Sequence, residues 1–191
     1  MSDVSLSPVS RPRVAPFVVL AVAVVLGGLF VVLASSDTAK PETAESYLLG
    51  KPAPRVVTTT LTDAPFDLTR RKGSWVVLNF FNSTCVPCKA EHSELVAFVQ
   101  QQSSLGVGAA EFYTVVNDDS DDAVRRWFAD NGGSWPILRD DDGAVAIAFG
   151  VAQVPETWVI DPDGIVQARY AGVTSAESLA SLLQSFREQR G

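Results

Sequence analysis

Two cysteines separated by two residues, Cys85 and Cys88, lie where an apolar run gives way to a helical pattern. Residues 75–81 are almost all apolar, as expected for a central strand buried on both faces, and residues 86–101 follow as the predicted helix. A thiol at a helix N-terminus faces unpaired backbone N–H groups and the positive end of the macrodipole, which favours thiolate over thiol. Pro87 falls in the first turn, where its missing N–H costs no hydrogen bond. The pattern predicts a redox-active dithiol.

Other uses of these cysteines fit less well. Cys85 and Cys88 are the only cysteines of the chain, so a structural zinc site with four thiolates is excluded. A disulfide across so short a loop removes little entropy from the unfolded chain, which makes it a poor structural cross-link. Two buried, inert thiols are an alternative, but they leave the strand–turn–helix placement unexplained. A C-x-x-C motif in this setting is typical of a thioredoxin-like redox centre.

The helical projection distinguishes the two thiols. Cys88 lies on one stripe with Leu95 and Val99, so it is predicted to face inward and Cys85 to be the more exposed thiol. Glu91 and His92 follow one turn after Cys88. Glu91 is either a carboxylate close to the thiols or a solvent-facing residue. His92, the only histidine, is predicted to be a surface residue.

Composition and one apolar segment indicate where the chain works. The net charge of −7 argues against a nucleic-acid partner. Residues 14–34 carry no charge and are long enough to span a bilayer; Arg11 and Arg13 precede them, which predicts a cytoplasmic N-terminus. The predicted organisation is therefore an N-terminus at 1–13, a transmembrane anchor at 14–34, a linker at 35–50 and an extracytoplasmic domain at 51–191. A cleaved signal peptide ending near residues 34–36 is the alternative. Either arrangement places the thiols in an oxidising compartment.

The remaining elements predict an α/β fold with a mixed central sheet between helices. Strands are expected at residues 55–61, 75–81, 111–116, 158–161 and 165–170, and helices at 86–101, 121–130, 144–149 and 175–187. The acidic run at 117–122 lacks the spacing of a calcium loop and is interpreted as the N-cap and first turn of the helix that follows.

Two stretches resemble a known family. Residues 149–161, FGVAQVPETWVID, and residues 77–80, VLNF, are similar to the corresponding segments of the membrane-anchored thioredoxin-like proteins of the TlpA, ResA and CcmG (DsbE) group, which serve cytochrome c maturation. The resemblance covers roughly residues 50–186 and implies a thioredoxin-like fold with no cofactor and no metal. Departures occur at Phe81 and Thr84, where the group often has tryptophan, and at Gln153, where it usually has glycine.

The resemblance also implies roles for individual residues. Cys85 is the expected nucleophile, Cys88 the resolving thiol and Pro155 a cis-proline facing the disulfide. The Val154 backbone is expected to pair with an extended substrate segment. Supporting and proton-transfer roles are expected for three further residues: Asn79, which replaces the buried aspartate of ordinary thioredoxins, and the carboxylates Glu91 and Glu156.

The expected function is the reduction of disulfides in exported proteins, with apocytochrome c as substrate and a membrane electron donor of the CcdA or DsbD kind. A general disulfide oxidant and a peroxiredoxin-like peroxidase are alternatives, although peroxiredoxins carry Thr or Ser where this chain has Asn82. A copper-binding module like the Sco proteins is an alternative of another class. Those proteins use C-x-x-x-C and a distant histidine, whereas here the spacing is shorter and the histidine lies on the same helix.

Overall fold

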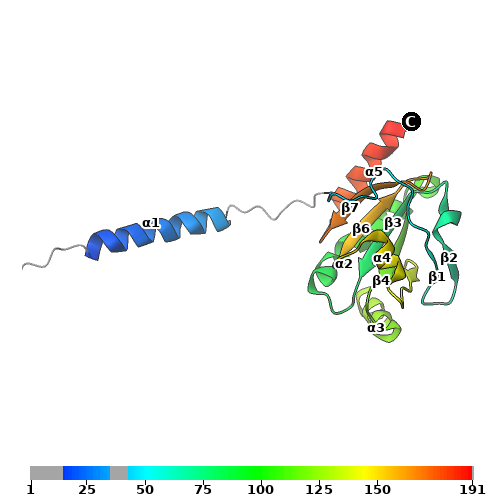
Figure 1. The fold of residues 1–191 in the computed structure, drawn as a ribbon, viewed down its shortest axis with the longest axis horizontal. Helices are drawn as coiled ribbons and strands as arrows, with labels where there is room; N and C mark the ends of the chain where they lie inside the picture. Colours follow the sequence, from blue (N-terminus) through cyan, green and yellow to red (C-terminus); the bar gives the residue numbers. More distant parts are fainter. Residues whose placement is uncertain (1–14, 35–42, 191) are drawn as a thin grey trace, which may run out of the picture. The chain divides into compact units, whose positions relative to one another are not determined.

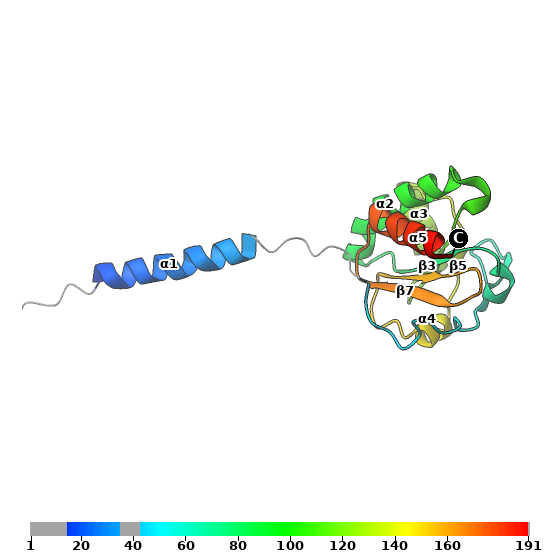
Figure 2. The ribbon, with the colours of Figure 1, turned by 90° about the horizontal axis from the view of Figure 1, so that it is seen from above.

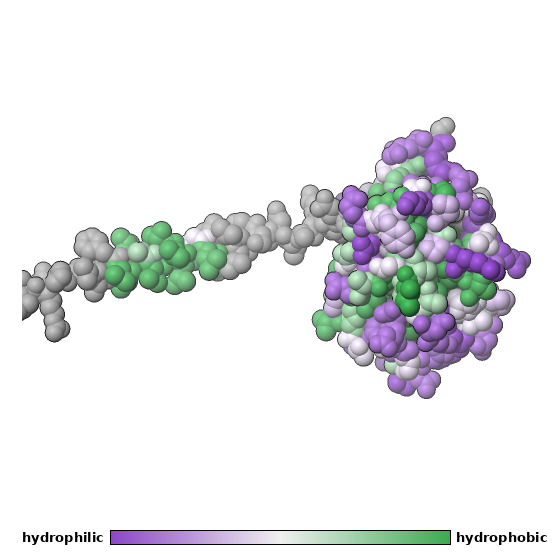
Figure 3. All heavy atoms as spheres, in the orientation of Figure 1, coloured by the Kyte–Doolittle hydropathy of each residue, from purple (hydrophilic) through white to green (hydrophobic). Residues whose placement is uncertain are grey.

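The computed structural model describes residues 15–34 and 43–190, which fall into two separate units. The first unit contributes helix α1 (Ala15–Ala34), an apolar helix whose described side chains are exposed and hydrophobic (Figure 3). No helix within the described residues combines the length and the apolar character required of a membrane span. The expectations for residues 1–13, Arg11 and Arg13 among them, lie outside the described residues. So do those for most of the linker.

The second unit is built on a five-stranded mixed sheet with the order β5-β4-β3-β6-β7 (Figure 1). Its strands are β3 (Val76–Phe81), β4 (Glu111–Val116), β5 (Ile137–Leu138), β6 (Glu156–Ile160) and β7 (Val166–Ala171). Strands β3, β4 and β5 are parallel, whereas β6 is antiparallel to both β3 and β7. A separate hairpin pairs β1 (Val57–Thr59) with β2 (Pro65–Asp67). The prediction of an α/β fold with a mixed sheet is confirmed.

Helices cover both faces of the sheet. On one face lie α2 (Val86–Ser103), α3 (Asp121–Asn131) and α5 (Ala176–Arg190), and on the other lies α4 (Ala144–Phe149) (Figure 2). Two 3-10 turns, η1 (Leu68–Arg71) and η2 (Gly106–Gly108), connect elements. Alternate residues of β3 enter the two cores: Val77 and Phe81 pack with α2 and α3, and Leu78 and Phe80 pack with α4. Because of this alternation, only polar residues on the α2 side of the sheet can reach the disulfide.

The structure corrects the predicted start of the domain. Residues 43–50 were expected to belong to a linker, but Thr43 bridges to Tyr170, and Leu48 is buried in the core on the α4 side. The Ala44 N–H donates to Arg169 O at 2.7 Å, and the Gly50 N–H donates to Val166 O at 2.8 Å. This segment therefore belongs to the domain and lies along β7.

Both outer strands of the sheet have partners beyond the sheet. Residues 43–52 accompany β7, and the N–H of Val166 donates back to Lys51 O. At the other edge, the segment after β1 accompanies β5: the Leu61 N–H donates to Ile137 O and the Arg139 N–H donates to Thr59 O. The two- and three-residue strands β5 and β2 were not predicted from the sequence.

Candidate active site

The disulfide lies directly after β3, at the first turn of α2. Cys85 is the N-cap residue of this helix, and its Sγ accepts the Cys88 N–H at 3.2 Å. Cys85 and Cys88 are joined as a disulfide with their Cα atoms 5.2 Å apart. Cys88 is fully buried, whereas Cys85 is half-buried, which confirms the predicted difference in exposure. An incoming disulfide can therefore reach Cys85 but not Cys88.

The loop before β6 brings a backbone carbonyl to the exposed sulfur. The Val154–Pro155 peptide bond is cis, as the resemblance implied, and Val154 O lies 3.5 Å from Cys85 Sγ. Val154 is half-buried and Pro155 is buried. Within residues 43–190, no hydrogen bond is formed by the Val154 N–H. An extended peptide beside Cys85 could pair with this backbone group.

Two residues that sequence reasoning missed hold the turn between β3 and Cys85. Asn82 Nδ2 donates to Asn117 O at 3.0 Å and to Asp118 O at 2.7 Å, while its Oδ1 accepts the Thr84 N–H at 2.8 Å. Asp119 Oδ2 accepts the Ser83 N–H at 2.5 Å. The loop after β4 thus fixes the turn that carries Cys85. An Asn at the end of a strand is a known local turn signal, although its partners come from a distant loop. Because Asn82 is occupied in this way, it is not a substitute for the peroxiredoxin Thr or Ser.

Glu91 is the buried ionisable group nearest in sequence to the resolving thiol. It lies one helical turn after Cys88, so the two side chains share a face of α2. Only 1% of Glu91 is exposed, which rules out the solvent-facing alternative. Its Oε1 accepts Asn79 Nδ2 at 2.8 Å and its Oε2 accepts the Thr174 N–H at 3.0 Å. Burial raises the pKa of Glu91 to about 7, although both hydrogen bonds act in the opposite direction.

Asn79 positions this carboxyl group. Besides Glu91, its Nδ2 donates to Thr157 Oγ1 at 3.0 Å, while its Oδ1 is buried without a partner among the described residues. A protonated Glu91 has an O–H to donate, and a rotated Asn79 amide could accept it. The pair can therefore adapt to either protonation state of Glu91, which suits a group that exchanges protons near neutral pH.

Replacing Glu91 with glutamine should make the reduced thiols ionise at lower pH. Above pH 7 Glu91 is mostly ionised, and its negative charge opposes formation of a thiolate one turn away. We expect the midpoint of a thiolate-absorbance titration of the reduced full chain, which reports both sulfurs, to fall by roughly one pH unit, the order expected for a nearby buried charge. Glu94→Gln is the matched control, because Glu94 lies on the same helix and is exposed. Equal titrations for wild type and Glu91→Gln would contradict the coupling.

The structure does not place Glu156 beside the disulfide. In the register of β3 and β6, Glu156 pairs with Phe80, on the α4 side of the sheet, whereas Thr157 pairs with Asn79 on the α2 side. The Glu156 carboxylate is 1% exposed and forms two hydrogen bonds with Arg169, at 2.7 and 2.9 Å. The predicted catalytic role of Glu156 is therefore replaced by a structural one, because its charge is compensated and faces away from Cys88.

His92 is also placed differently from the prediction. It is 5% exposed, not a surface residue, and its ring packs against Trp127, Phe128 and Trp135. Its Nε2 lies 3.0 Å from Gly132 O. The reason is that α3 covers this flank of α2, so the buried face is wider than the stripe of Cys88, Leu95 and Val99. A histidine enclosed by these three aromatic side chains does not support the copper-binding alternative.

Comparison with known proteins agrees with this geometry. Residues 49–169 match the AhpC/TSA family. The chain is 34% identical to the thiol:disulfide interchange protein HelX of Rhodobacter capsulatus, over 69% of this chain and 73% of HelX. It is 32% identical to DsbE of Escherichia coli, over 69% of this chain and 70% of DsbE. The crystal structure of a thiol:disulfide interchange protein of the thioredoxin family from Chlorobium tepidum covers 74% of this chain. It is matched over 98% of its own length, at 22% identity and a TM-score of 0.62.

Proposed function

Because the chain belongs to the AhpC/TSA family and is a thiol–disulfide oxidoreductase of the DsbE type, we propose that it reduces disulfides of exported proteins, apocytochrome c in particular. The observation that carries the proposal is the Cys85–Cys88 disulfide at the start of α2, with Val154 O 3.5 Å from the half-buried Cys85 sulfur. One sulfur is reachable and the other is protected. The Val154 N–H beside them has no hydrogen-bond partner within residues 43–190.

The proposed reaction begins with the reduced pair. The Cys85 thiolate attacks one sulfur of the substrate disulfide, which forms a mixed disulfide and releases the other substrate sulfur as a thiolate that takes up a proton. Cys88 then loses its proton and attacks Cys85 Sγ. This step forms the Cys85–Cys88 disulfide and releases the second substrate thiol. Two electrons and two protons pass to the substrate in total.

Three groups support these steps. The Cys88 N–H and the N-terminus of α2 stabilise the Cys85 thiolate. The Val154 backbone aligns an extended substrate segment. Glu91, whose pKa is raised to about 7 by burial, is the proposed acceptor of the Cys88 proton. The oxidised pair needs a dithiol donor, and we propose a membrane protein of the CcdA or DsbD kind.

The test uses two oxidised peptides of equal length. One contains the C-x-x-C-H sequence of a c-type haem attachment site, and the other contains the same residues in an order that separates the histidine from the cysteines. We expect the reduced full chain to reduce the first at least about tenfold faster, a difference of about 1.4 kcal/mol in the transition state. Equal rates for both peptides indicate a general reductant. Finding the Cys85–Cys88 pair oxidised in growing cells indicates the oxidant alternative.

We also propose that the N-terminal segment anchors the protein in the cell membrane with the domain on the extracytoplasmic side. The proposal rests on the sequence: residues 14–34 are uncharged and follow Arg11 and Arg13. The intact mass of the protein purified from membranes should include these residues. A mature protein that begins near residue 37 would support signal-peptide cleavage instead.

A further inference from the structure

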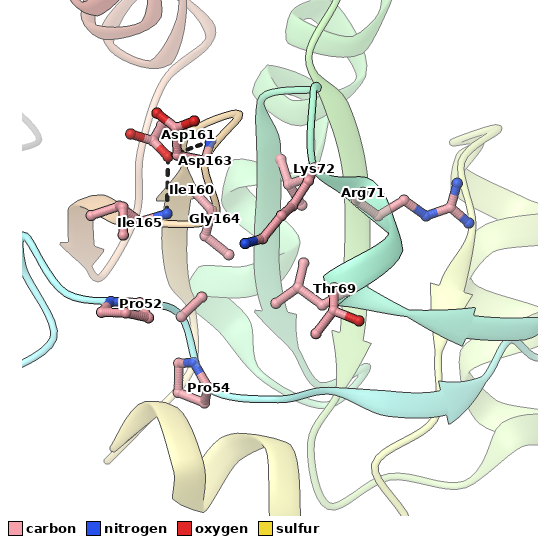
Figure 4. A pocket seen from close by; sticks show the side chains of 13 residues that line it. Pro52, Pro54, Thr69, Arg71, Lys72, Ile160, Asp161, Asp163, Gly164 and Ile165 are labelled. Atoms are coloured by element: carbon pink, nitrogen blue, oxygen red, sulfur yellow. Dashed lines mark hydrogen bonds between the residues drawn. The ribbon is translucent and has the colours of Figure 1, made fainter.

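A cavity of about 250 Å³ lies at the end of the sheet opposite the disulfide (Figure 4). Its floor includes Val76, the first residue of β3, whereas Cys85 follows the last residue of that strand. Six strand residues span about 20 Å, so the cavity is separate from the redox site. The volume is just below the range of about 300–1,000 Å³ typical of drug-sized ligands, so it suits a smaller molecule.

The walls are apolar and come from three separate segments. The core residues Leu68, Val76 and Ile160 form the floor, and Pro52, Ala53 and Pro54 form one side. Hydrogen bonds between these segments fix the walls: the Ala53 N–H donates to Gly164 O at 2.9 Å, and the Gly73 N–H donates to Pro162 O at 2.8 Å. A cavity held in this way is formed before a ligand arrives, which lowers the entropic cost of binding.

The acidic groups at the rim are held by one arginine and by hydrogen bonds. Asp161 is 3% exposed and its Oδ2 accepts both Gln167 Nε2 and Arg190 Nη1, at 2.8 and 3.0 Å. Its Oδ1 accepts the N–H groups of Asp163 and Ile165. The Asp163 carboxylate pairs with Arg190 Nη2 at 2.6 Å. A cationic ligand would therefore have to compete with Arg190 for these carboxylates.

One cation at the rim is unpaired. Lys72 forms no ion pair or hydrogen bond through its side chain with residues 15–34 or 43–190. In Figure 4 its ammonium group is directed into the space between Gly164, Pro52 and Thr69. Its chain lies over Gly164, where a Cβ would approach Lys72 Cε to 3.3 Å. Arg71 points away from the cavity, and its Nη1 lies 3.7 Å from Glu111 Oε2.

We propose that this cavity binds a small monocarboxylate with an apolar body, the carboxylate facing Lys72 and the body lying on Leu68, Val76 and Ile160. A single lysine matches a single negative charge. A phosphate monoester, which carries nearly two charges at neutral pH, would be only half compensated. The apolar floor supplies the burial energy, and the lysine supplies the preference for an anion.

The test compares three ligands of nearly equal shape: phenylacetate, phenylacetamide and phenethylammonium. The full-length, ¹⁵N-labelled chain in a zwitterionic detergent is titrated with each, and the amide signals of Ala53, Lys72 and Gly164 are followed. Phenylacetate should give saturable shifts at these residues and bind about two- to fivefold tighter than the amide, the range of an exposed ion pair. Phenethylammonium should not bind.

Two variants and one control complete the test. Lys72→Met keeps the packing on Gly164 and removes the charge, so it should remove the preference for phenylacetate over phenylacetamide. Ala53→Leu fills the cavity and should abolish the shifts while the rest of the spectrum stays folded. Lys89→Met, at an exposed lysine on α2, should bind as wild type does. The absence of saturable shifts at millimolar phenylacetate, or equal affinity for the acid and the amide, would overturn the proposal.

Discussion

Cys88→Ser is expected to accumulate covalent complexes with substrate proteins, and Cys85→Ser is expected to form none. In Cys88→Ser the half-buried Cys85 still attacks a substrate disulfide, but no second thiol remains to release the product. Both variants should lose at least about 10³-fold in multiple-turnover reduction, because each removes a reacting sulfur. The measurement is diagonal electrophoresis of membrane extracts, without and with reductant, combined with a peptide-reduction assay.

Ala90→Ser serves as the matched control, since it adds a hydroxyl on an exposed position of the same helix without touching either sulfur. It should reduce substrate at the wild-type rate. Complexes that accumulate in Cys85→Ser instead would reverse the assignment of the nucleophile. That result would also require α2 to open, because Cys88 has no exposed surface in the oxidised domain.

Arg169→Met should lower the free energy of unfolding by about 3–5 kcal/mol. The change leaves the Glu156 carboxylate, which is 1% exposed, without the cation that now donates two hydrogen bonds to it. It also removes the hydrogen bond from Arg169 Nη1 to Glu45 O, which ties residues 43–50 to β7. The measurement is chemical denaturation of the full chain, with wild type in the same buffer.

Two further variants separate the effect of an unpaired buried charge from the effect of losing an arginine side chain. Arg169→Met with Glu156→Gln should be more stable than Arg169→Met alone, because no unpaired charge remains buried. Arg126→Met, at an exposed arginine on α3, should change stability by about 0.5 kcal/mol at most. If Arg169→Met lowers the free energy of unfolding no more than Arg126→Met does, the Glu156–Arg169 pair does not stabilise the domain.

The longest apolar runs predicted the fold well. The interior strand β4 and the helix α4 have the predicted bounds, and β3 and α2 differ from theirs by one or two residues. Each of these elements is a run of at least six residues that can be recognised without its pairing partner. The short strands β2 and β5 cannot, because two or three residues are too few for a pattern and only the pairing partner defines them.

Polar residues at core positions explain the error at His92 and the two alternatives left open at Glu91. The buried positions of α2 are Cys88, Glu91, His92, Leu95, Phe98 and Gln102. This is the spacing of three and four expected of a buried face, so the positions of Glu91 and His92 already indicated burial. Polar side chains usually face solvent, and for that reason the sequence wrongly predicts His92 at the surface and leaves two alternatives for Glu91. The partners that accept them, Asn79, Thr174 and Gly132, are distant in sequence and could not be read from it.

The residues that accompany the outer strands limit where another chain can add to this sheet. Residues 43–52 occupy the outer side of β7, and the segment around Thr60 occupies that of β5, so neither edge is a free template for a further strand. A soluble fragment that begins at residue 51, the boundary suggested by composition, would leave the outer edge of β7 without most of its hydrogen-bond partners. Such an exposed edge favours aggregation between copies. A fragment that keeps Thr43 retains its own protection against self-association.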